Sequence, residues 1–380
     1  MILFIRPMIR FIQKIFVANG KKTSGSYTYD FLILLLFILL FYFVRVSFSV
    51  LKESSDSMSP ALLKGDWIFI DKLGYGETVR LAGKEIRVPL FRKIERGDLI
   101  VFRFPEGDTV YTFDPLLNYY EIKRRSLVEK TKTDHSERKY LPLTERIKYM
   151  KRCIALPGDT IMIEAGKICL NGERYDEKYP VKRKYHLYLS NPNKFFAENE
   201  GKQDVFIQKW QDHYWILLST DEYKRIGEIL NNIENIDTIF PFVDTARSYN
   251  IYPFLKDHPA SWTLDDYGPV YVPGKGDTIL LKGEDLYKYF RLVSVYERQN
   301  AVIRNDSVFL DGRYCEKYVC KQNYYFVMGD NRHMSVDSRS WGLVPENYLI
   351  GKALFILWSK DPLRKGVRKI RWDRMLKGIR

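Results

Sequence analysis

Few residues of the kinds that hold metals or form hydrolytic triads occur in this 380-residue sequence. It contains four cysteines, with no Cys-x-x-Cys pair, and five histidines. A zinc site is therefore not expected. The sequence also lacks a Gly-x-Ser-x-Gly segment, which excludes the nucleophile turn of the α/β-hydrolases. Four of the five histidines lie in charged stretches without a motif, so a Ser-His-Asp triad has little support.

Acidic residues are missing at one end of the chain and scarce at the other. Residues 1–29 hold five Lys and Arg and no acid, and residues 360–380 hold nine Lys and Arg against two Asp. These ends carry much of the formal net charge of +14. Because they adjoin apolar or amphipathic sequence, the charge favours an anionic membrane surface over nucleic acid. We therefore expect a phospholipid partner and no nucleic acid.

The sequence has one long apolar run, FLILLLFILLFYFVRVSFSVL at Phe31–Leu51. About 20 apolar residues cross the hydrocarbon core as a helix, and Arg45 lies near enough to the end for its stem to reach the interface. A cleaved signal peptide would have a shorter core and a small-residue cleavage site, and a buried core helix is the other alternative. We predict an uncleaved transmembrane anchor over residues 30–51. Lys21 and Lys22 place its start in the cytoplasm, so the rest of the chain is exported.

Both charged ends have amphipathic character. Arg6, Arg10 and Lys14 recur every four residues among apolar ones, which predicts a helix on the inner leaflet. Whether residues 1–19 also insert in the membrane stays open. The tail LRKGVRKIRWDRMLKGIR suits either an amphipathic helix on anionic lipid or a solvated, disordered segment.

The exported part has the pattern of a β protein. Tyr (27) and Phe (23) are abundant, which favours strands. Apolar alternation between turn signals predicts strands in DWIFIDKL, DLIVFRF, TIMIEAGKICLNGERY, TILLKG, AVIRNDSVFLDGRY and NYYFVMGD. Asn171-Gly172 and Asp311-Gly312 stand where two-residue hairpin turns need them, and a helical period occurs only at Ser219–Asn235. We expect a mainly antiparallel β fold.

Two charged stretches look inserted into this pattern. Gly107–Arg146 lacks strand periodicity, and residues 176–321 are domain-sized and contain the helical segment. The expected organisation is a cytoplasmic basic segment (1–29), the anchor (30–51), a main β domain in two parts (52–175 and 322–360) around an inserted mixed second domain (176–321), and a basic tail (361–380).

The four cysteines fall into two pairs. Export would permit a disulfide between Cys315 and Cys320, but their oxidation state stays open. Cys153 and Cys169 lie in apolar strand patterns and are expected to be buried thiols.

One lysine lies within a predicted strand, YMKRCIALPGD (Tyr149–Asp159). A free lysine has a pKa of about 10.4 and is protonated near neutrality, so it cannot act as a base. Burial without a carboxylate partner lowers that pKa. Lys151 would share a strand face with Tyr149 and Cys153, while Arg152 would point to solvent. The alternative is that Lys151 itself is a solvated residue.

Serines gather in two further segments. SSDSMSPALLKGDW (Ser54–Trp67) begins three residues after the apolar run, and MGDNRHMSVDSRSWG (Met328–Gly342) follows a predicted strand. A serine nucleophile needs a base within hydrogen-bond reach. In the second segment, Asp337 and Arg339 are close enough in sequence to form an ion pair that holds a loop.

In order and spacing, SDSMSP, KRCIALPGD and GDNRHMSVDSRSWG resemble the box motifs of the type I signal peptidase family, bacterial membrane-anchored Ser/Lys proteases. The resemblance implies that Ser57 is the nucleophile and Lys151 the general base. It also implies that the Ser55 hydroxyl and the Ser57 N–H stabilise the oxyanion. The family's β fold agrees with the predicted strands, and its chemistry needs no metal or cofactor.

The resemblance assigns supporting roles as well. Ser335 would hydrogen-bond Lys151, and Asp337 and Arg339 would brace the loop beneath the two catalytic residues. Met58 and Pro60 would belong to the substrate cleft.

Several positions depart from the common pattern of the family. Ala61 follows the proline where Thr is frequent, and Ala155 stands where Gly often precedes Leu-Pro-Gly-Asp. His333 and Met334 occupy positions that are often polar or acidic. A His replaces the catalytic Lys in eukaryotic relatives, but because Lys151 is present we do not expect His333 to be catalytic.

The resemblance implies an endopeptidase that removes signal peptides from exported preproteins. It would be anchored once in the bacterial cytoplasmic (inner) membrane, with its catalytic domain on the outer, periplasmic face and a cleft for small side chains at the first and third positions before the scissile bond. One alternative is a self-cleaving regulator of the LexA type, which would carry a DNA-binding module. Another is a catalytically inactive, membrane-tethered protein that binds a partner through residues 176–321.

Overall fold

The computed structural model describes residues 32–38, 40, 44, 47–81, 83–87, 92–114, 118–129, 137–188, 206–210, 213–231, 238–241, 251–253 and 262–379. Contacts divide the chain into two units, Met1–Ser49 and Val50–Arg380. In the first unit, residues 32–38 are helical. Within the described part of the chain, no helix has the length and apolarity needed to cross a bilayer. The predicted amphipathic segment at residues 1–29 lies outside the described residues.

The predicted anchor extends too far at its C-terminal end. Phe48–Lys52 forms strand β1, which lies beside β2 (Asp66–Asp71) at one edge of the main sheet. Apolar residues suit a sheet edge as well as a bilayer helix, so hydropathy alone cannot place this boundary. The predicted end of the anchor at Leu51 is therefore wrong, because residues 48–51 belong to a strand.

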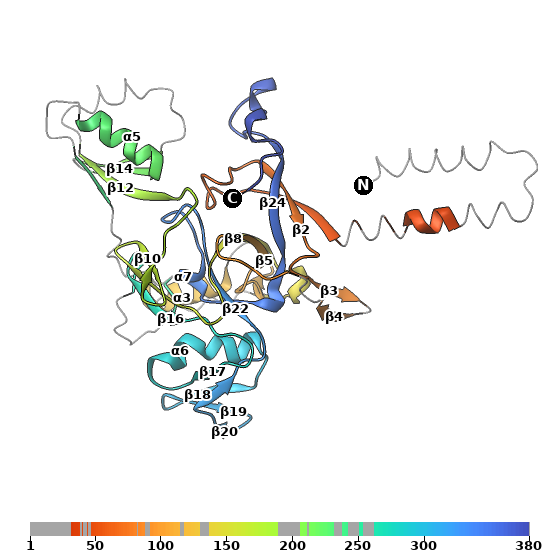
Figure 1. Ribbon diagram of the computed structural model, residues 1–380. Coiled ribbons are helices and arrows are strands. Elements are labelled where there is room, and N and C mark those ends of the chain that lie inside the picture. Colours follow the sequence, from red (N-terminus) through yellow and green to blue (C-terminus); the bar gives the residue numbers. More distant parts are fainter. Residues whose placement is uncertain are drawn as a thin grey trace, which may run out of the picture. The chain divides into compact units, whose positions relative to one another are not determined.

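A seven-stranded sheet forms the centre of the second unit (Figure 1). Its order is β1, β2, β24 (Leu349–Ser359), β5 (Leu99–Arg103), β8 (Lys148–Ala155), β22 (Tyr324–Met328) and β23 (Val344–Pro345). The described pairings from β2 to β23 are antiparallel. This confirms the prediction of a mainly antiparallel β fold.

Both faces of the sheet are covered at its centre. In β5, Ile100 and Phe102 belong to one buried hydrophobic cluster, whereas Leu99 and Val101 belong to another. Alternate residues of a strand point to opposite faces, so a central strand has no solvated face here. The neighbouring strand β8 is accordingly buried over its last six residues.

The other strands form smaller sheets. One consists of β11 (Glu173–Arg174), β10 (Lys167–Leu170), β9 (Thr160–Glu164) and β16 (Tyr267–Tyr271), and another of β13 (Phe206–Trp210), β14 (His213–Ser219), β12 (Lys182–Tyr188) and β15 (Thr238–Pro241). The shortest are β3 (Thr78–Leu81) with β4 (Lys84–Arg87), β6 (Thr109–Tyr111) with β7 (Arg138–Tyr140), β17 (Thr278–Leu280) with β21 (Lys317–Val319), and β18 (Ala301–Arg304) with β19 (Ser307–Leu310) and β20 (Arg313–Tyr314). All six predicted strand segments are confirmed.

Both predicted hairpin turns are also confirmed. Asn171 and Gly172, between β10 and β11, have φ angles of 56° and 85°. Asp311 and Gly312, between β19 and β20, have φ angles of 47° and 79°. A two-residue turn that matches the twist of its strands needs positive φ at both positions, which explains the Asn-Gly and Asp-Gly pairs.

Helical segments are α3 (Tyr119–Glu129), α5 (Thr220–Asn231), α6 (Gly283–Arg291), α7 (Ser338–Trp341), a π turn at Leu292–Tyr296, and 3-10 turns at Leu143–Glu145, Glu346–Tyr348, Gly366–Lys369 and Trp372–Arg374. α5 confirms the predicted helical period. α3 and α6 were not predicted, and the stretch that forms α3 is polar. Asn118 precedes the first residue of α3, and its side chain accepts hydrogen bonds from the N–H groups of Tyr120 and Glu121.

The segment predicted as an insertion, residues 176–321, contributes to two parts of the structure. β12 to β15 form a sheet of their own. β16 instead pairs with β9, and Leu286 and Tyr289 of α6 join the hydrophobic cluster that contains Ile100. The boundaries at 176 and 321 stay a prediction.

The four cysteines are free thiols. Cys315 and Cys320 therefore do not form a disulfide in this structure. Cys153 is buried as predicted, whereas Cys169 is only partly buried.

The C-terminal tail follows neither of the two expected alternatives. Residues near its end pair with the second half of β24, where the Leu376 N–H donates to the Ile356 carbonyl at 2.6 Å and the Ile379 N–H donates to the Leu354 carbonyl at 3.0 Å. Ile379 also packs against the hydrophobic cluster that contains Met58. The tail is thus hydrogen-bonded to the main sheet along β24.

Arg374 fastens this tail to the turn between β1 and β2. Its Nη2 donates to the buried Asp66 carboxylate at 2.7 Å and to the Ala61 carbonyl at 2.9 Å.

We expect Arg374→Ala to lower the free energy of unfolding by about 1.5–3 kcal/mol, because it removes hydrogen bonds to a charged, buried acceptor. Urea unfolding in detergent measures this. The exposed Arg364, replaced by Ala, serves as the control with an expected loss below about 0.5 kcal/mol, and equal losses in both variants would contradict the expectation.

Candidate active site

Lys151 lies in the buried part of β8. Its register partner on β5 is Ile100, and only 3% of its surface is exposed. The amine lies 5.8 Å from the centre of the Tyr149 ring. Burial of this lysine follows from the central position of its strand, so the alternative of a solvated residue is wrong.

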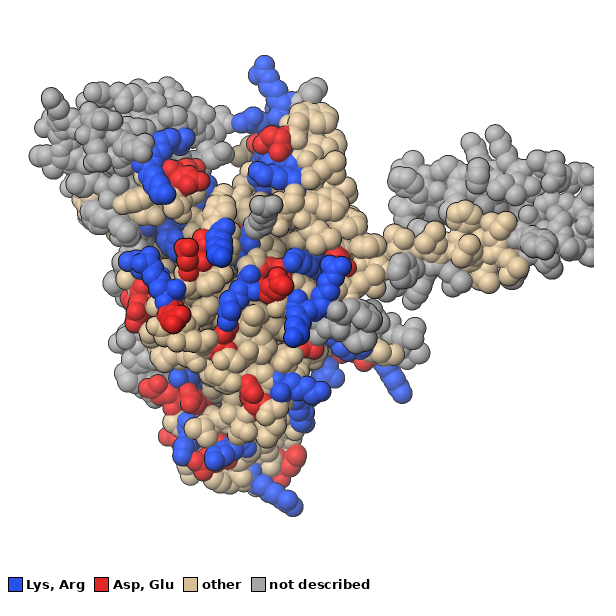
Figure 2. Space-filling view, in the orientation of Figure 1, with Lys and Arg blue, Asp and Glu red and all other residues tan. Residues whose placement is uncertain are grey.

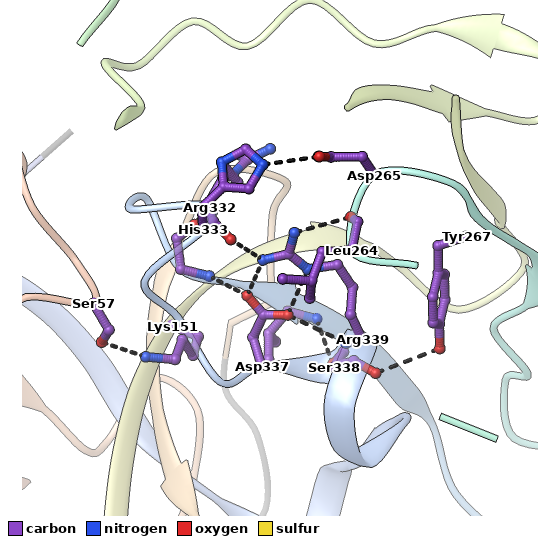
Figure 3. A network of polar contacts seen from close by, with 12 residues as sticks. Ser57, Lys151, Leu264, Asp265, Tyr267, Arg332, His333, Asp337, Ser338 and Arg339 are labelled. Atoms are coloured by element: carbon purple, nitrogen blue, oxygen red, sulfur yellow. Dashed lines mark hydrogen bonds and ion pairs between the residues drawn. The ribbon is translucent and has the colours of Figure 1, made fainter. Parts of the chain in front are cut away.

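Ser57 lies in the turn that connects β1 to β2. Its Oγ is 2.5 Å from Lys151 Nζ (Figure 3). The Ser57 carbonyl accepts a hydrogen bond from the Asn331 N–H at 3.1 Å, and Asn331 Nδ2 donates to the Asp56 carbonyl at 3.2 Å. These two bonds fix the turn to the loop that follows β22. The three sequence segments thus meet at one place.

The surroundings of Lys151 disfavour its charged form. Burial lowers the pKa of its amine below the ordinary lysine value. The charges of Asp337, Glu53 and Asp330 oppose this effect and that of Arg339 adds to it, but burial dominates. Within the described part of the chain, no carboxylate lies within ion-pair distance of the amine. A buried amine of this kind can accept a proton.

Asp337 and Arg339 form the predicted ion pair at the start of α7. Two parallel hydrogen bonds of 2.9 and 2.8 Å join them, and Asp337 Oδ2 also accepts from the Gly329 N–H at 3.0 Å. Arg339 further donates to the carbonyls of Leu264 and Arg332 (Figure 3). Burial raises the pKa of the Asp337 carboxyl, but the charge and hydrogen bonds of Arg339 with the Gly329 N–H hold it below its ordinary value. The pair therefore connects the loop after β22 to α7.

Ser335 does not form the hydrogen bond to Lys151 that the family resemblance implies. Its Oγ is buried and has no hydrogen-bond partner in the described part of the chain. The side chain packs against Gly329, where a Cβ atom would lie 2.5 Å from Ser335 Cβ and 2.6 Å from the Ser57 carbonyl oxygen. Ser335 thus lies close to Ser57 without bonding to the Lys151 amine.

Ser55 lies on the other side of Ser57. Their hydroxyl oxygens are 3.1 Å apart. The Ser55 hydroxyl donates to Glu53 Oε1 at 2.7 Å, and the Ser55 N–H donates to the same oxygen at 2.8 Å. Sequence reasoning missed Glu53, since an acid at the end of an apolar run carries no motif.

Met58 and Pro60 differ in exposure. Met58 is completely buried in the second hydrophobic cluster, with Leu62, so in this structure it supports the turn from beneath and offers no surface to a substrate. Pro60 is partly exposed. A place in the substrate cleft stays a prediction for Pro60.

Arg152 does not point to solvent as predicted. It is fully buried and forms two hydrogen bonds to Asp330, at 2.7 and 2.6 Å. Its guanidinium also lies 4.0 Å from the centre of the Tyr179 ring. The prediction failed because strand alternation separates a solvated face from a buried one only where one face is solvated, and β8 is covered on both.

His333 lies in a separate polar cluster. Its Nε2 is 2.9 Å from the Asp265 carboxylate, and its Nδ1 accepts from the Lys184 N–H at 3.1 Å (Figure 3). These contacts occupy both ring nitrogens. Residues 32–379, where described, contain no group of three or more His, Cys, Asp or Glu residues placed to hold a metal ion.

The arrangement unites a serine hydroxyl with a buried amine that has no acid in contact. A family model described as "Signal peptidase, peptidase S26" matches residues 27–223 and 272–358, which is well over half of the chain. The chain belongs to this signal peptidase family.

Curated signal peptidases also match over most of the length. Signal peptidase I of Buchnera aphidicola subsp. Schizaphis graminum is 24% identical over 355 residues, which cover 92% of this chain and 79% of the relative. The enzyme of Buchnera aphidicola subsp. Baizongia pistaciae is 23% identical over 340 residues, covering 89% and 77%. A shorter match, 54% identical over 46 residues, joins 12% of this chain to 18% of signal peptidase I of Aquifex aeolicus.

The signal peptidase match has one internal gap, at residues 224–271. This gap is much shorter than the predicted insertion of residues 176–321. The stretch that the family model leaves unmatched runs from the first turn of α5 to the end of β16.

Position 329 requires a glycine because Ser335 and the Ser57 carbonyl lie very close to its Cα atom. We expect Gly329→Ala to reduce processing of a preprotein by about 10²-fold, because the added methyl group would push the Ser57 carbonyl and Ser335 out of place, and small misplacements in a site have effects of this size. Gly378→Ala is the control, since nothing lies within 4 Å of its added methyl group. Activity of the Gly329 variant equal to that of the control would contradict the close approach.

Proposed function

We propose that this protein is a signal peptidase I, which cleaves the signal peptides of exported preproteins with a Ser57 nucleophile and a Lys151 general base. The observation that carries the proposal is the 2.5 Å contact between Ser57 Oγ and the buried Lys151 Nζ. Membership of the signal peptidase family supports the substrate class. By the family resemblance, the cleft accepts small side chains at the first and third positions before the scissile bond.

The neutral Lys151 amine starts the reaction by taking the proton of the Ser57 hydroxyl. The oxygen then attacks the scissile carbonyl carbon, and the carbonyl oxygen becomes an oxyanion. Burial supports this step because it lowers the pKa of the amine. The oxyanion then re-forms the carbonyl as the scissile C–N bond breaks. The ammonium formed on Lys151 gives its proton to the leaving nitrogen, and the acyl group stays on Ser57.

The oxyanion needs donors close to Ser57. The Ser57 N–H donates to no other described residue, so it is available for this purpose. The Ser55 hydroxyl would be the second donor, but it points to Glu53 in this structure and must rotate first. Each such donor contributes roughly 10²–10³ in rate.

Water completes the cycle. Lys151, neutral again after the leaving amine has departed, takes a proton from water as the water attacks the acyl carbon. The bond from that carbon to Ser57 Oγ then breaks, and the ammonium of Lys151 returns the proton to Ser57 Oγ. The same buried base thus serves both halves of the reaction.

A membrane location is the second part of the proposal. The apolar run at residues 31–47 would anchor the chain in the bacterial inner membrane, with the catalytic unit on the outer face. Figure 2 shows an area with few charges along β2 and β24. The side chains of Trp67 in β2, Leu357 in β24 and Trp372 in the tail are exposed. Tryptophans together with the basic tail suit the interface of an anionic bilayer.

Variants of the two catalytic residues test the proposal. We expect Ser57→Ala and Lys151→Ala each to lose processing of a preprotein in detergent by about 10⁴-fold or more, because each removes one half of a unit that acts together. Lys148→Ala, on the same strand but exposed, should stay within about twofold of wild type.

Two outcomes would contradict this proposal in different ways. Equal processing by the wild type and both catalytic variants would exclude the Ser57–Lys151 mechanism. Failure of the wild type to process any preprotein would favour the inactive, tethered protein, which no observation on the described residues supports.

The pH dependence of processing gives a further test. Only neutral Lys151 can act as a base, so kcat/KM should rise with pH through the pKa of this amine. Because burial lowers that pKa, the midpoint should lie below the ordinary lysine value of about 10.4. A midpoint at or above the ordinary value, measured with a peptide substrate whose own groups do not titrate in this range, would count against Lys151 as the base.

A further inference from the structure

Glu53 is a buried acid next to the catalytic turn to which neither the family resemblance nor the sequence assigns a role. It follows β1 directly, and its backbone is fixed at both ends. The Glu53 N–H donates to the Asp66 carbonyl at 2.7 Å, and the Gly65 N–H donates to the Glu53 carbonyl at 2.9 Å. Only 7% of its surface is exposed. The main chain of Glu53 is therefore fixed, and its side chain is covered by other residues.

A single oxygen of this carboxylate binds Ser55 twice. Oε1 accepts both the Ser55 N–H and the Ser55 hydroxyl. A serine hydroxyl has one proton to donate, so the proton given to Glu53 is not available to Ser57. Across the 3.1 Å that separates the two hydroxyl oxygens, Ser57 must then be the donor and Ser55 the acceptor.

A chain of four groups results. With Lys151 protonated, the ammonium donates to Ser57, Ser57 donates to Ser55, and Ser55 donates to Glu53. Each serine hydroxyl proton in this resting arrangement has an acceptor, and the chain ends on a negative charge. Once Lys151 has lost its proton, the Ser57 hydroxyl can turn to donate to the amine.

We propose that Glu53 is a positioning residue of the peptidase, which holds Ser55 against the nucleophile and makes its activity dependent on the Glu53 charge. The inference rests on the proposed Ser57–Lys151 chemistry. Glu53 touches neither the nucleophile nor the base, and it acts through Ser55.

The charge of Glu53 also acts on Lys151. Asp337 at the start of α7 and Asp330 after β22 likewise favour the ammonium, and Arg339 disfavours it. Asp337 is paired with Arg339, and Asp330 with Arg152. No described cation lies within ion-pair distance of Glu53, so its charge stabilises the ammonium without local compensation. Removing it should therefore move the rise of activity to lower pH.

Two variants separate charge from geometry. Glu53→Gln keeps an oxygen that can accept both hydrogen bonds from Ser55 but removes the charge. We expect its kcat/KM profile to rise at lower pH than that of wild type, with a plateau within about threefold of wild type. Glu53→Ala removes the acceptor as well, and we expect its plateau to fall by roughly tenfold, the effect of one lost hydrogen bond on the orientation of Ser57.

The control is Asp56→Asn, which removes a carboxylate next to the nucleophile that is exposed and therefore screened by water. Its profile should coincide with that of wild type. Melting curves of all variants in detergent establish whether they are folded. If Glu53→Ala does not fold, the pH profile of Glu53→Gln alone decides the test.

The inference is overturned if the Gln profile coincides with wild type, or if the Gln and Asn variants shift equally, which would indicate a general charge effect. An unchanged plateau in a folded Ala variant would also overturn the positioning role. Failure of the wild type itself to process a preprotein would instead contradict the proposed function. The failure of the inference on Glu53 and the failure of the proposed function are therefore distinguishable.

Discussion

The contact between the buried Lys151 amine and the Ser57 hydroxyl is the interaction on which the rest of the site depends. An ammonium is strongly hydrated, and burial removes that water. Burial therefore favours the neutral form of the amine. A carboxylate in contact would reverse this effect. The fold must therefore place a lysine in the middle of a covered sheet and keep every acid away from it, and β8 between two hydrophobic clusters meets the first condition.

The second condition is met by pairing the nearby acids with other groups. Asp337 binds Arg339, Asp330 binds Arg152, and Glu53 binds Ser55. The two arginines thus keep buried carboxylates occupied a short distance from the amine. An unpaired buried charge is costly, which gives a physical reason for two Arg–Asp pairs around a single lysine. The same loops carry Asn331, which hydrogen-bonds the Ser57 carbonyl, and Gly329, which leaves room for it, so electrostatics and geometry depend on one set of contacts.

Much of this arrangement could be predicted from the sequence, and the failures have physical causes. Alternating apolar residues and the Asn171-Gly172 turn predicted strands and hairpins because those signals are local. Contacts between distant segments gave no such signal: Arg152 was predicted to be solvated, and the tail was not expected to pair with β24. Glu53 was missed for another reason, since an acid at the end of an apolar run carries no motif. Family resemblance found the three segments that meet, but it also implied a hydrogen bond from Ser335 to Lys151 that this structure does not form. The predicted end of the anchor at Leu51 was wrong because a sheet edge and a bilayer helix accept the same apolar residues.

The most direct measurement is the titration of the Lys151 side chain itself, followed by the chemical shift of its ¹³Cε in full-length protein labelled at lysine and held in detergent. Comparison with Lys151→Arg identifies the resonance. A buried amine without an acid in contact should lose its proton below the ordinary lysine value of about 10.4. Titration at or above that value would show that the ammonium is stabilised in the folded protein, and Lys151 could then not serve as the base for Ser57.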